Sequence, residues 1–203
     1  MKVGIMGGTF NPIHKGHLML ATFAISQCSL DKIWFMPSGL PAHKSNEELL
    51  DATHRMEMVK LAIEEETSFV ASPFEIEREG FTYTADTMIE LKKCYPELNF
   101  YFIIGGDSLM KFHQWVRPDI ISAHTTLLAA GRSGYSKEEL EKQATYLKQQ
   151  FGTNVLFLDM PEFPISSREI RAWLKEGNYE KAKDALPKKV VNYIEQHHLY
   201  QGR

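Results

Sequence analysis

Short apolar runs alternate along the chain with stretches in which apolar residues recur every three or four positions. The runs read as strands, because nearly continuous apolar runs are typical of parallel strands covered on both faces. The expected strands are Val3–Met6, Lys32–Met36, Phe69–Ala71, Phe100–Ile104, Thr126–Ala130 and Val155–Leu158. The stretches between them predict amphipathic helices. This alternation predicts an α/β fold built on a doubly wound, mainly parallel sheet.

The pattern changes after Leu158, where no further strand is expected. Three helices are predicted there, over Ser166–Glu176, Tyr179–Ala185 and Lys188–His198. A chain of 203 residues fits one domain with a small appendage. We therefore expect an α/β core over residues 1–160 and a C-terminal helical subdomain over residues 161–203.

The composition narrows the classes of protein to consider. With 23 Lys+Arg against 26 Asp+Glu, the net charge of −3 argues against a general binder of nucleic acid or of membrane surfaces, which carry a basic footprint. An anionic ligand would have to be bound by local groups. The two cysteines form no CxxC pair, and no apolar run approaches the ~20 residues that a membrane span needs. We expect a soluble, cytoplasmic protein, for which a homodimer is possible.

The loop after the first expected strand reads Gly-Gly-Thr-Phe-Asn-Pro-Ile-His-Lys-Gly-His over residues 7–17. It matches neither the GxGxxG dinucleotide fingerprint nor the P-loop. Its glycines permit close backbone approach, and the following helix N-terminus attracts anions. His14 and His17 fall on one face of the first turn, where an imidazole can hold a phosphate. The alternatives are a metal site, with His43 as a further ligand, and a purely structural pair; the glycine-rich turn favours phosphate chemistry, and we expect no metal ligands.

A second motif, Ile165-Ser-Ser-Arg-Glu-Ile-Arg171, opens one of the C-terminal helices. Ser166 and Glu169 form a capping box, which is a sufficient structural explanation of the pattern. Two hydroxyls, free N–H groups and two arginines at a helix start also form an anion site. Both interpretations stay open from these residues alone.

These two motifs carry a resemblance. Residues 8–17 resemble the signature of the HxGH nucleotidyltransferase superfamily, and residues 165–171 resemble its ISSTxxR motif. Arg168 stands where that motif has Thr, so its contact with ATP is left open. The resemblance implies a Rossmann-like domain that transfers a nucleotidyl group from a nucleoside triphosphate to a phosphate-bearing acceptor and releases pyrophosphate.

Four further segments resemble the bacterial nicotinate mononucleotide adenylyltransferases within this superfamily: Pro37–Lys44, Gly80–Thr87, Ile103–Ser108 and Phe112–Arg117. The resemblance implies that ATP and nicotinate mononucleotide are joined to give deamido-NAD and pyrophosphate in NAD biosynthesis. Each segment also has a plain structural interpretation. Lys44 can be a solvated surface charge, Thr84 a helix N-cap, Asp107 a helix cap and Trp115 a core residue.

Motifs and resemblance together assign the site. The residues expected in catalysis are His14, His17, Lys44 and Arg171. Those expected to bind ATP are Gly8, Thr9, Phe10, His17, Gly105, Asp107, Arg132, Ile165, Ser166, Ser167 and Arg171. Those expected to bind nicotinate mononucleotide are Thr9, Asn11, Lys44, Tyr83, Thr84, Asp107 and Trp115. Mg²⁺ is expected to be carried by the ATP phosphates.

Two other functions of the same fold remain alternatives. One is a sister enzyme with another acceptor, such as nicotinamide mononucleotide, phosphopantetheine, riboflavin phosphate or glycerol phosphate. The other is a nucleotide-binding sensor without catalytic activity. An acceptor panel and a pyrophosphate-release assay discriminate among them.

Overall fold

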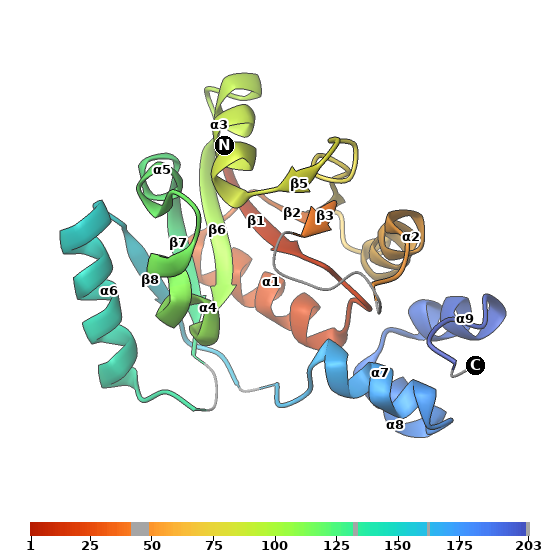
Figure 1. Ribbon diagram of the computed structural model, residues 1–203. Helices are drawn as coiled ribbons and strands as arrows, with labels where there is room; N and C mark the ends of the chain where they lie inside the picture. Colours follow the sequence, from red (N-terminus) through yellow and green to blue (C-terminus); the bar gives the residue numbers. More distant parts are fainter. Residues whose placement is uncertain (42–48, 132–133, 162, 202–203) are drawn as a thin grey trace.

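A central sheet of six parallel strands organises the described part of the chain. The computed structural model describes residues 1–41, 49–131, 134–161 and 163–201. The strands, in spatial order, are β4 (Phe69–Ala71), β2 (Lys32–Pro37), β1 (Lys2–Gly8), β6 (Asn99–Gly105), β7 (Thr125–Ala130) and β8 (Val155–Leu158). All six strands expected from the apolar runs are confirmed, and the fold is the doubly wound, Rossmann-like α/β sheet (Figure 1).

The chain reverses its direction of travel across the sheet at β1. β1 pairs with β2 on one side and with β6 on the other, in registers that include Val3 with Lys32 and Val3 with Phe100. Such a switch point opens a crevice at the carboxyl ends of the strands, where open α/β sheets bind ligands. The loops that follow β1 and β6 therefore flank the predicted binding crevice.

Helices cover both faces of the sheet and bury one apolar cluster on each. The helices up to β8 are α1 (Lys15–Cys28), α2 (Ala52–Ile63), α3 (Thr84–Cys94), α4 (Gly106–Lys111), α5 (Pro118–His124) and α6 (Lys137–Phe151). Residues of α1 and α2 enter one cluster, whereas residues of α3 to α6 enter the other. The two clusters explain why the central strands carry nearly continuous apolar runs, since these strands bury both of their faces. The edge strands β4 and β8 expose apolar residues such as Val70, Leu156 and Phe157.

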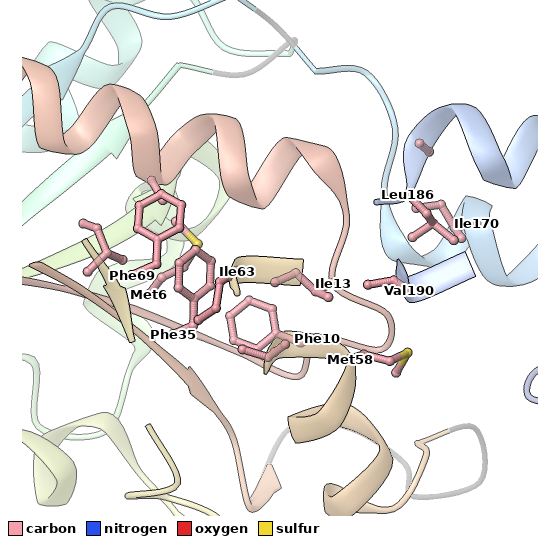
Figure 2. Close-up of a cluster of buried hydrophobic side chains, with 14 of the residues drawn as sticks. Met6, Phe10, Ile13, Phe35, Met58, Ile63, Phe69, Ile170, Leu186 and Val190 are labelled. Carbon is pink, nitrogen blue, oxygen red and sulfur yellow. The ribbon is translucent and has the colours of Figure 1, made fainter. Parts of the chain in front are cut away.

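The C-terminal helices α7 (Ser167–Lys175), α8 (Tyr179–Ala185) and α9 (Lys188–Gln196) lie close to the predicted ranges. They share the first apolar cluster rather than forming one of their own. Figure 2 shows Ile170, Leu186 and Val190 on the side of this cluster nearest to Ile13. α9 packs on α2 and α7 on α8. The last helices are thereby fixed next to the loop that follows β1.

Some short elements carry too little periodicity to be expected from the sequence. β3 (Leu40–Pro41) and β5 (Phe81–Thr82) form a separate two-stranded parallel ladder. α4, α5 and a 3₁₀ turn over Phe112–Gln114 are also short. None of the helices in the part of the chain that the structure describes is long and apolar enough to cross a membrane.

Candidate active site

A cleft of about 930 Å³ lies at the carboxyl edge of the sheet. Of the residues predicted for the site, those that line it are Gly8, Thr9, Phe10, Asn11, His14, His17, Tyr83, Thr84, Gly105, Trp115, Ser166, Ser167 and Arg171. Asp107 and Ile165 are absent from the lining. Lys44 and Arg132 lie outside the described residues. Arg168 is exposed and lines the cleft.

The two histidines meet at the N-terminus of α1. His14 is the N-cap residue and is buried, and the centroids of the His14 and His17 rings are 3.8 Å apart. The backbone N–H of His14 donates to Nδ1 of His17 at 3.2 Å. A neutral His17 that accepts at Nδ1 must carry its proton on Nε2. The local fold thus fixes His17 as an Nε2–H donor, which suits a phosphate oxygen.

Gly16 lies where another segment approaches the helix closely. A Cβ at Gly16 would lie 2.5 Å from Cδ1 of Phe163 and 3.0 Å from Nδ1 of His14. Real Cβ atoms do not approach other atoms so closely, so a side chain there would displace one of these rings. The glycine between the two histidines is therefore required by the packing of the segment that precedes α7.

The second motif is tied directly to the loop after β1. Ser167 Oγ donates to the carbonyl oxygen of Pro12 at 2.9 Å, and Arg171 Nη1 donates to the carbonyl oxygen of Asn11 at 2.9 Å. Asn11 and Arg171 are 160 positions apart in the chain. The structure thus brings the two motifs together in one cleft, as the sequence analysis predicts.

The capping box at the start of α7 is also present. The backbone N–H of Ser166 donates to Glu169 Oε2 at 2.8 Å, and the Ser166 hydroxyl donates to the same oxygen at 2.7 Å. These hydrogen bonds lower the pKa of the Glu169 carboxyl. The capping box predicted for this motif is therefore confirmed. Ser166 also lines the cleft.

At the other end of the cleft, α3 begins beside Trp115. The N-cap of α3 is Tyr83, so the prediction of Thr84 as the N-cap is wrong by one position; Thr84 is the first helical residue. Trp115 is half-buried, with its ring edge-on to Phe102 at 6.1 Å between centroids. It lines the cleft and also packs on the core, so the core interpretation is confirmed in part, and stacking on a substrate ring stays a prediction.

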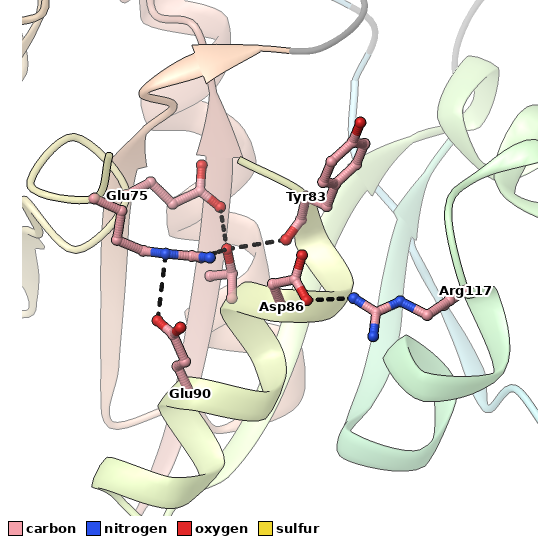
Figure 3. A network of polar contacts seen from close by, with 7 residues as sticks. Glu75, Tyr83, Asp86, Glu90 and Arg117 are labelled. Carbon is pink, nitrogen blue, oxygen red and sulfur yellow. Dashed lines mark hydrogen bonds and ion pairs between the residues drawn. The ribbon is translucent and has the colours of Figure 1, made fainter. Parts of the chain in front are cut away.

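A buried carboxyl escaped the sequence analysis. Glu75 lines the cleft, and Thr87 donates its hydroxyl to Oε1 at 2.7 Å (Figure 3). Arg78 donates to Thr87 Oγ1 at 3.2 Å and pairs with Glu90 at 3.3 Å. Burial raises the pKa of Glu75. Its neighbours in sequence, Glu-Arg-Glu over residues 77–79, read as a solvated charge run, and so gave no signal of a buried group.

A buried arginine supports the loops of the cleft without lining it. The side chain of Arg55, on α2, is 1% exposed. It donates to the carbonyl oxygens of Leu50 at 2.9 Å, Thr9 at 3.0 Å and Gly39 at 3.4 Å. Burial lowers the pKa of its guanidinium. Arg55 therefore joins the loops after β1 and β2 to the start of α2.

Two buried hydroxyls also line the cleft. Ser38 Oγ and Thr82 Oγ1 have no hydrogen-bond partner among the residues that the structure describes. Within the same residues, no group of three or more His, Cys, Asp or Glu side chains is placed to hold a metal ion.

Comparison with known proteins agrees with this geometry. A family model described as cytidylyltransferase-like matches residues 5–173. A Bacillus subtilis nicotinate-nucleotide adenylyltransferase is 40% identical over 202 residues, which is 99% of both chains. A Lachnoclostridium phytofermentans protein named "Probable nicotinate-nucleotide adenylyltransferase" is 43% identical over 98% of both chains.

A solved structure shares the fold. The Plasmodium falciparum nicotinic acid mononucleotide adenylyltransferase complexed with NaAD superposes with a TM-score of 0.81, at 22% identity, over 98% of this chain and 97% of that one. Family, fold and the meeting of both motifs in one cleft agree with the resemblance found in the sequence. This chain belongs to the cytidylyltransferase-like family and, within it, to the nicotinate-nucleotide adenylyltransferases.

Proposed function

We propose that this protein transfers the adenylyl group of ATP to nicotinate mononucleotide, giving deamido-NAD and pyrophosphate in NAD biosynthesis. The observation that carries the proposal is the hydrogen bond from Arg171, in the second motif, to Asn11, in the loop of the first. It places the histidine pair and the start of α7 on one cleft. The names of the bacterial relatives support this substrate pair.

The reaction is a direct in-line displacement. An oxygen of the mononucleotide 5′-phosphate attacks the α-phosphorus of ATP; the new P–O bond forms as the bond to the β-phosphate oxygen breaks, and pyrophosphate leaves. The nucleophile is already ionised, so no general base is required. Catalysis consists of positioning and of stabilising negative charge on the phosphates.

The proposed roles follow the position along the cleft for the groups that line it, and the resemblance for Asp107, Arg132 and Ile165. His14 and His17, with the backbone N–H groups of Gly8 and Thr9, hold the α- and β-phosphates. The Nε2–H donor of His17 acts on charge that develops there. The remaining ATP-binding residues are Phe10, Gly105, Asp107, Arg132, Ile165, Ser166, Ser167 and Arg171. Residues 161–203 thus form a helical subdomain that completes the ATP site.

The mononucleotide is assigned to the end of the cleft formed by α3 and Trp115. The helix N-terminus at Tyr83 and Thr84 offers N–H donors and partial positive charge to the nicotinate carboxylate. A neutral carboxamide has no net charge, so it is bound less strongly at this helix N-terminus. The pyridine ring stacks on Trp115. The phosphate and ribose of the mononucleotide are assigned to Thr9, Asn11, Lys44 and Asp107.

A divalent cation, Mg²⁺, is proposed to accompany ATP. Because no group of three ligating side chains exists among the described residues, the ion would take its ligands from phosphate oxygens and water. When bound, it neutralises part of the triphosphate charge. His14, His17 and Arg171 then act on the oxygens that remain exposed to the protein.

The decisive experiment compares nicotinate and nicotinamide mononucleotides as acceptors, with ATP, in steady state. We expect a strong preference for the nicotinate form in kcat/KM, with pyrophosphate and deamido-NAD formed in equal amounts. Preference for the nicotinamide form would overturn the assigned substrate. Phosphopantetheine, riboflavin phosphate and glycerol phosphate in the same panel test the sister activities, and no pyrophosphate release with any acceptor would indicate a sensor.

A further inference from the structure

The side chain of Asn11 is held from the far end of the chain. The phenol of Tyr200 donates to Asn11 Oδ1 at 2.8 Å, across a separation of 189 residues. The backbone N–H of Leu50 donates to the same oxygen at 3.4 Å, and Arg171 holds the backbone carbonyl of Asn11. Asn11 itself is 3% exposed and lines the cleft.

These contacts determine which way the amide faces. A backbone N–H can only donate, so the amide atom that faces Leu50 must be the oxygen. With Oδ1 directed at Leu50 and Tyr200, the NH₂ group lies on the opposite side of Cγ. The side chain of Asn11 is thus oriented so that it acts elsewhere as a donor, the polarity that a phosphate oxygen requires.

The surroundings of Tyr200 keep its phenol protonated, so that it can donate a hydrogen bond. Its ring packs against the first apolar cluster, next to the buried side chain of Leu199. His198 and Tyr200 both have positive φ, at 51° and 63°, which turns the chain back after α9. Burial raises the pKa of Tyr200 well above its ordinary value, against the opposing effect of Arg171 and Arg55. The phenol therefore keeps its proton and remains a donor throughout the neutral range.

We propose that Tyr200 is a positioning residue that fixes the Asn11 amide as a hydrogen-bond donor to the phosphate of the mononucleotide. This inference rests on the proposed function, which assigns Asn11 to that substrate. Tyr200 does not itself touch substrate; it acts through Asn11. If Tyr200 only packed against the core, removal of its hydroxyl would leave the binding of the mononucleotide unchanged.

The test removes that hydroxyl alone. We expect Tyr200→Phe to lower kcat/KM for nicotinate mononucleotide about 2- to 13-fold, the loss typical of one hydrogen bond. We expect KM for ATP to change less than twofold. Tyr193→Phe is the matched control, since Tyr193 lies in α9 and its hydroxyl contacts His54 at 2.9 Å instead of Asn11. The control should stay within twofold of the unaltered chain.

A double-mutant cycle separates positioning from packing. In an Asn11→Ala background, Tyr200→Phe should have no further effect on kcat/KM, because its route to the substrate is gone. Independent, multiplicative losses would overturn the proposal, as would a Tyr200→Phe enzyme with unaltered kcat/KM. Thermal unfolding of each variant shows whether a loss of activity reflects a loss of fold.

A readout without turnover keeps this inference separate from the proposed function. The side-chain amide resonances of Asn11 in a nitrogen-15 spectrum should shift in Tyr200→Phe and stay in place in Tyr193→Phe. Unshifted resonances would refute the positioning role even in an active enzyme. A different outcome would be an unaltered chain that does not adenylylate nicotinate mononucleotide, together with shifted Asn11 resonances in Tyr200→Phe. It would refute the proposed function and leave the contact between Tyr200 and Asn11 established.

Discussion

The ring of Phe163 lies parallel to that of His14, with 5.6 Å between centroids and 8° between planes. The segment before α7 therefore covers the N-cap residue of α1 with an aromatic face. The same ring occupies the space above Gly16. One contact thus links the two motifs by packing, in addition to the hydrogen bonds of Ser167 and Arg171.

Gly16→Ala tests this contact. The added methyl group must displace Phe163 or His14, and we expect turnover to fall roughly 10- to 100-fold, because small misplacements of reacting groups are costly. Adding Phe163→Ala should restore part of the loss by providing space. The measurement is kcat for the single and double variants beside Phe163→Ala alone. A double variant no better than Gly16→Ala would show that the clash lies elsewhere.

His17→Ala should remove a donor that acts on the phosphates. Loss of one such donor typically costs ~10²–10³ in turnover, which is the decrease we expect. The melting temperature should fall by only a few degrees, since the change removes one hydrogen bond, from His14 N–H to His17 Nδ1, and leaves the backbone bond from residue 17 to the carbonyl oxygen of His14. His113→Ala is a control on an exposed histidine. Near-normal turnover by His17→Ala would remove His17 from the mechanism.

Trp115→Ala should act mainly on the mononucleotide. Loss of stacking on the pyridine ring should raise KM for nicotinate mononucleotide about tenfold or more, while KM for ATP stays near its original value. Because the ring also contacts Phe102 and Phe112, some loss of stability should accompany the change. Trp115→Phe should retain much of both properties. Equal increases in the two KM values would indicate a structural role only.

Arg55→Met should destabilise the whole fold. It removes the donors to three carbonyl oxygens in the interior, each of which costs about 1–3 kcal/mol when left unsatisfied. A total of about 3 kcal/mol or more lowers the melting temperature by roughly 6–12 °C in a domain of this size. Lys60→Met, at an exposed position of the same helix, is the control. A melting temperature within about 2 °C of the unaltered chain would contradict this structural role.

Glu75 should make stability depend on pH. Its pKa is raised in the folded chain above the ordinary value of 4.5, so the folded state holds this proton at a pH where the unfolded chain has lost it. The resulting stabilisation is complete below 4.5 and is lost as the pH rises through the folded-state pKa. Glu75→Gln should flatten this decline in the free energy of unfolding, whereas Glu77→Gln, at an exposed position, should not. Parallel curves for Glu75→Gln and the unaltered chain would contradict the assignment.

The main sheet could be predicted because its central strands bury both faces and its two edge strands are also apolar, so that every strand appears as an apolar run. The histidine pair could be predicted because it follows a glycine-rich turn at the start of a helix. The Arg171 motif was predicted from its resemblance to the ISSTxxR motif, since a capping box is a sufficient explanation of its residues. Glu75 and Arg55 could not, since only the tertiary fold buries them, and a charged residue in a charged stretch gives no sign of burial. The ladder of β3 and β5 is two residues long on each side and has no periodicity to detect.

The contact between Tyr200 and Asn11 makes the loop after the central strand depend on the far end of the described chain. β1 is the first strand of the chain, and the loop that follows it is held by a side chain 189 residues further along. A chain whose segment after α9 has not docked can form the sheet, yet it lacks the hydrogen bond from Tyr200 to Asn11. With the proposed role of Tyr200, the orientation of Asn11 is complete only once the segment that follows α9 has docked on the loop after β1.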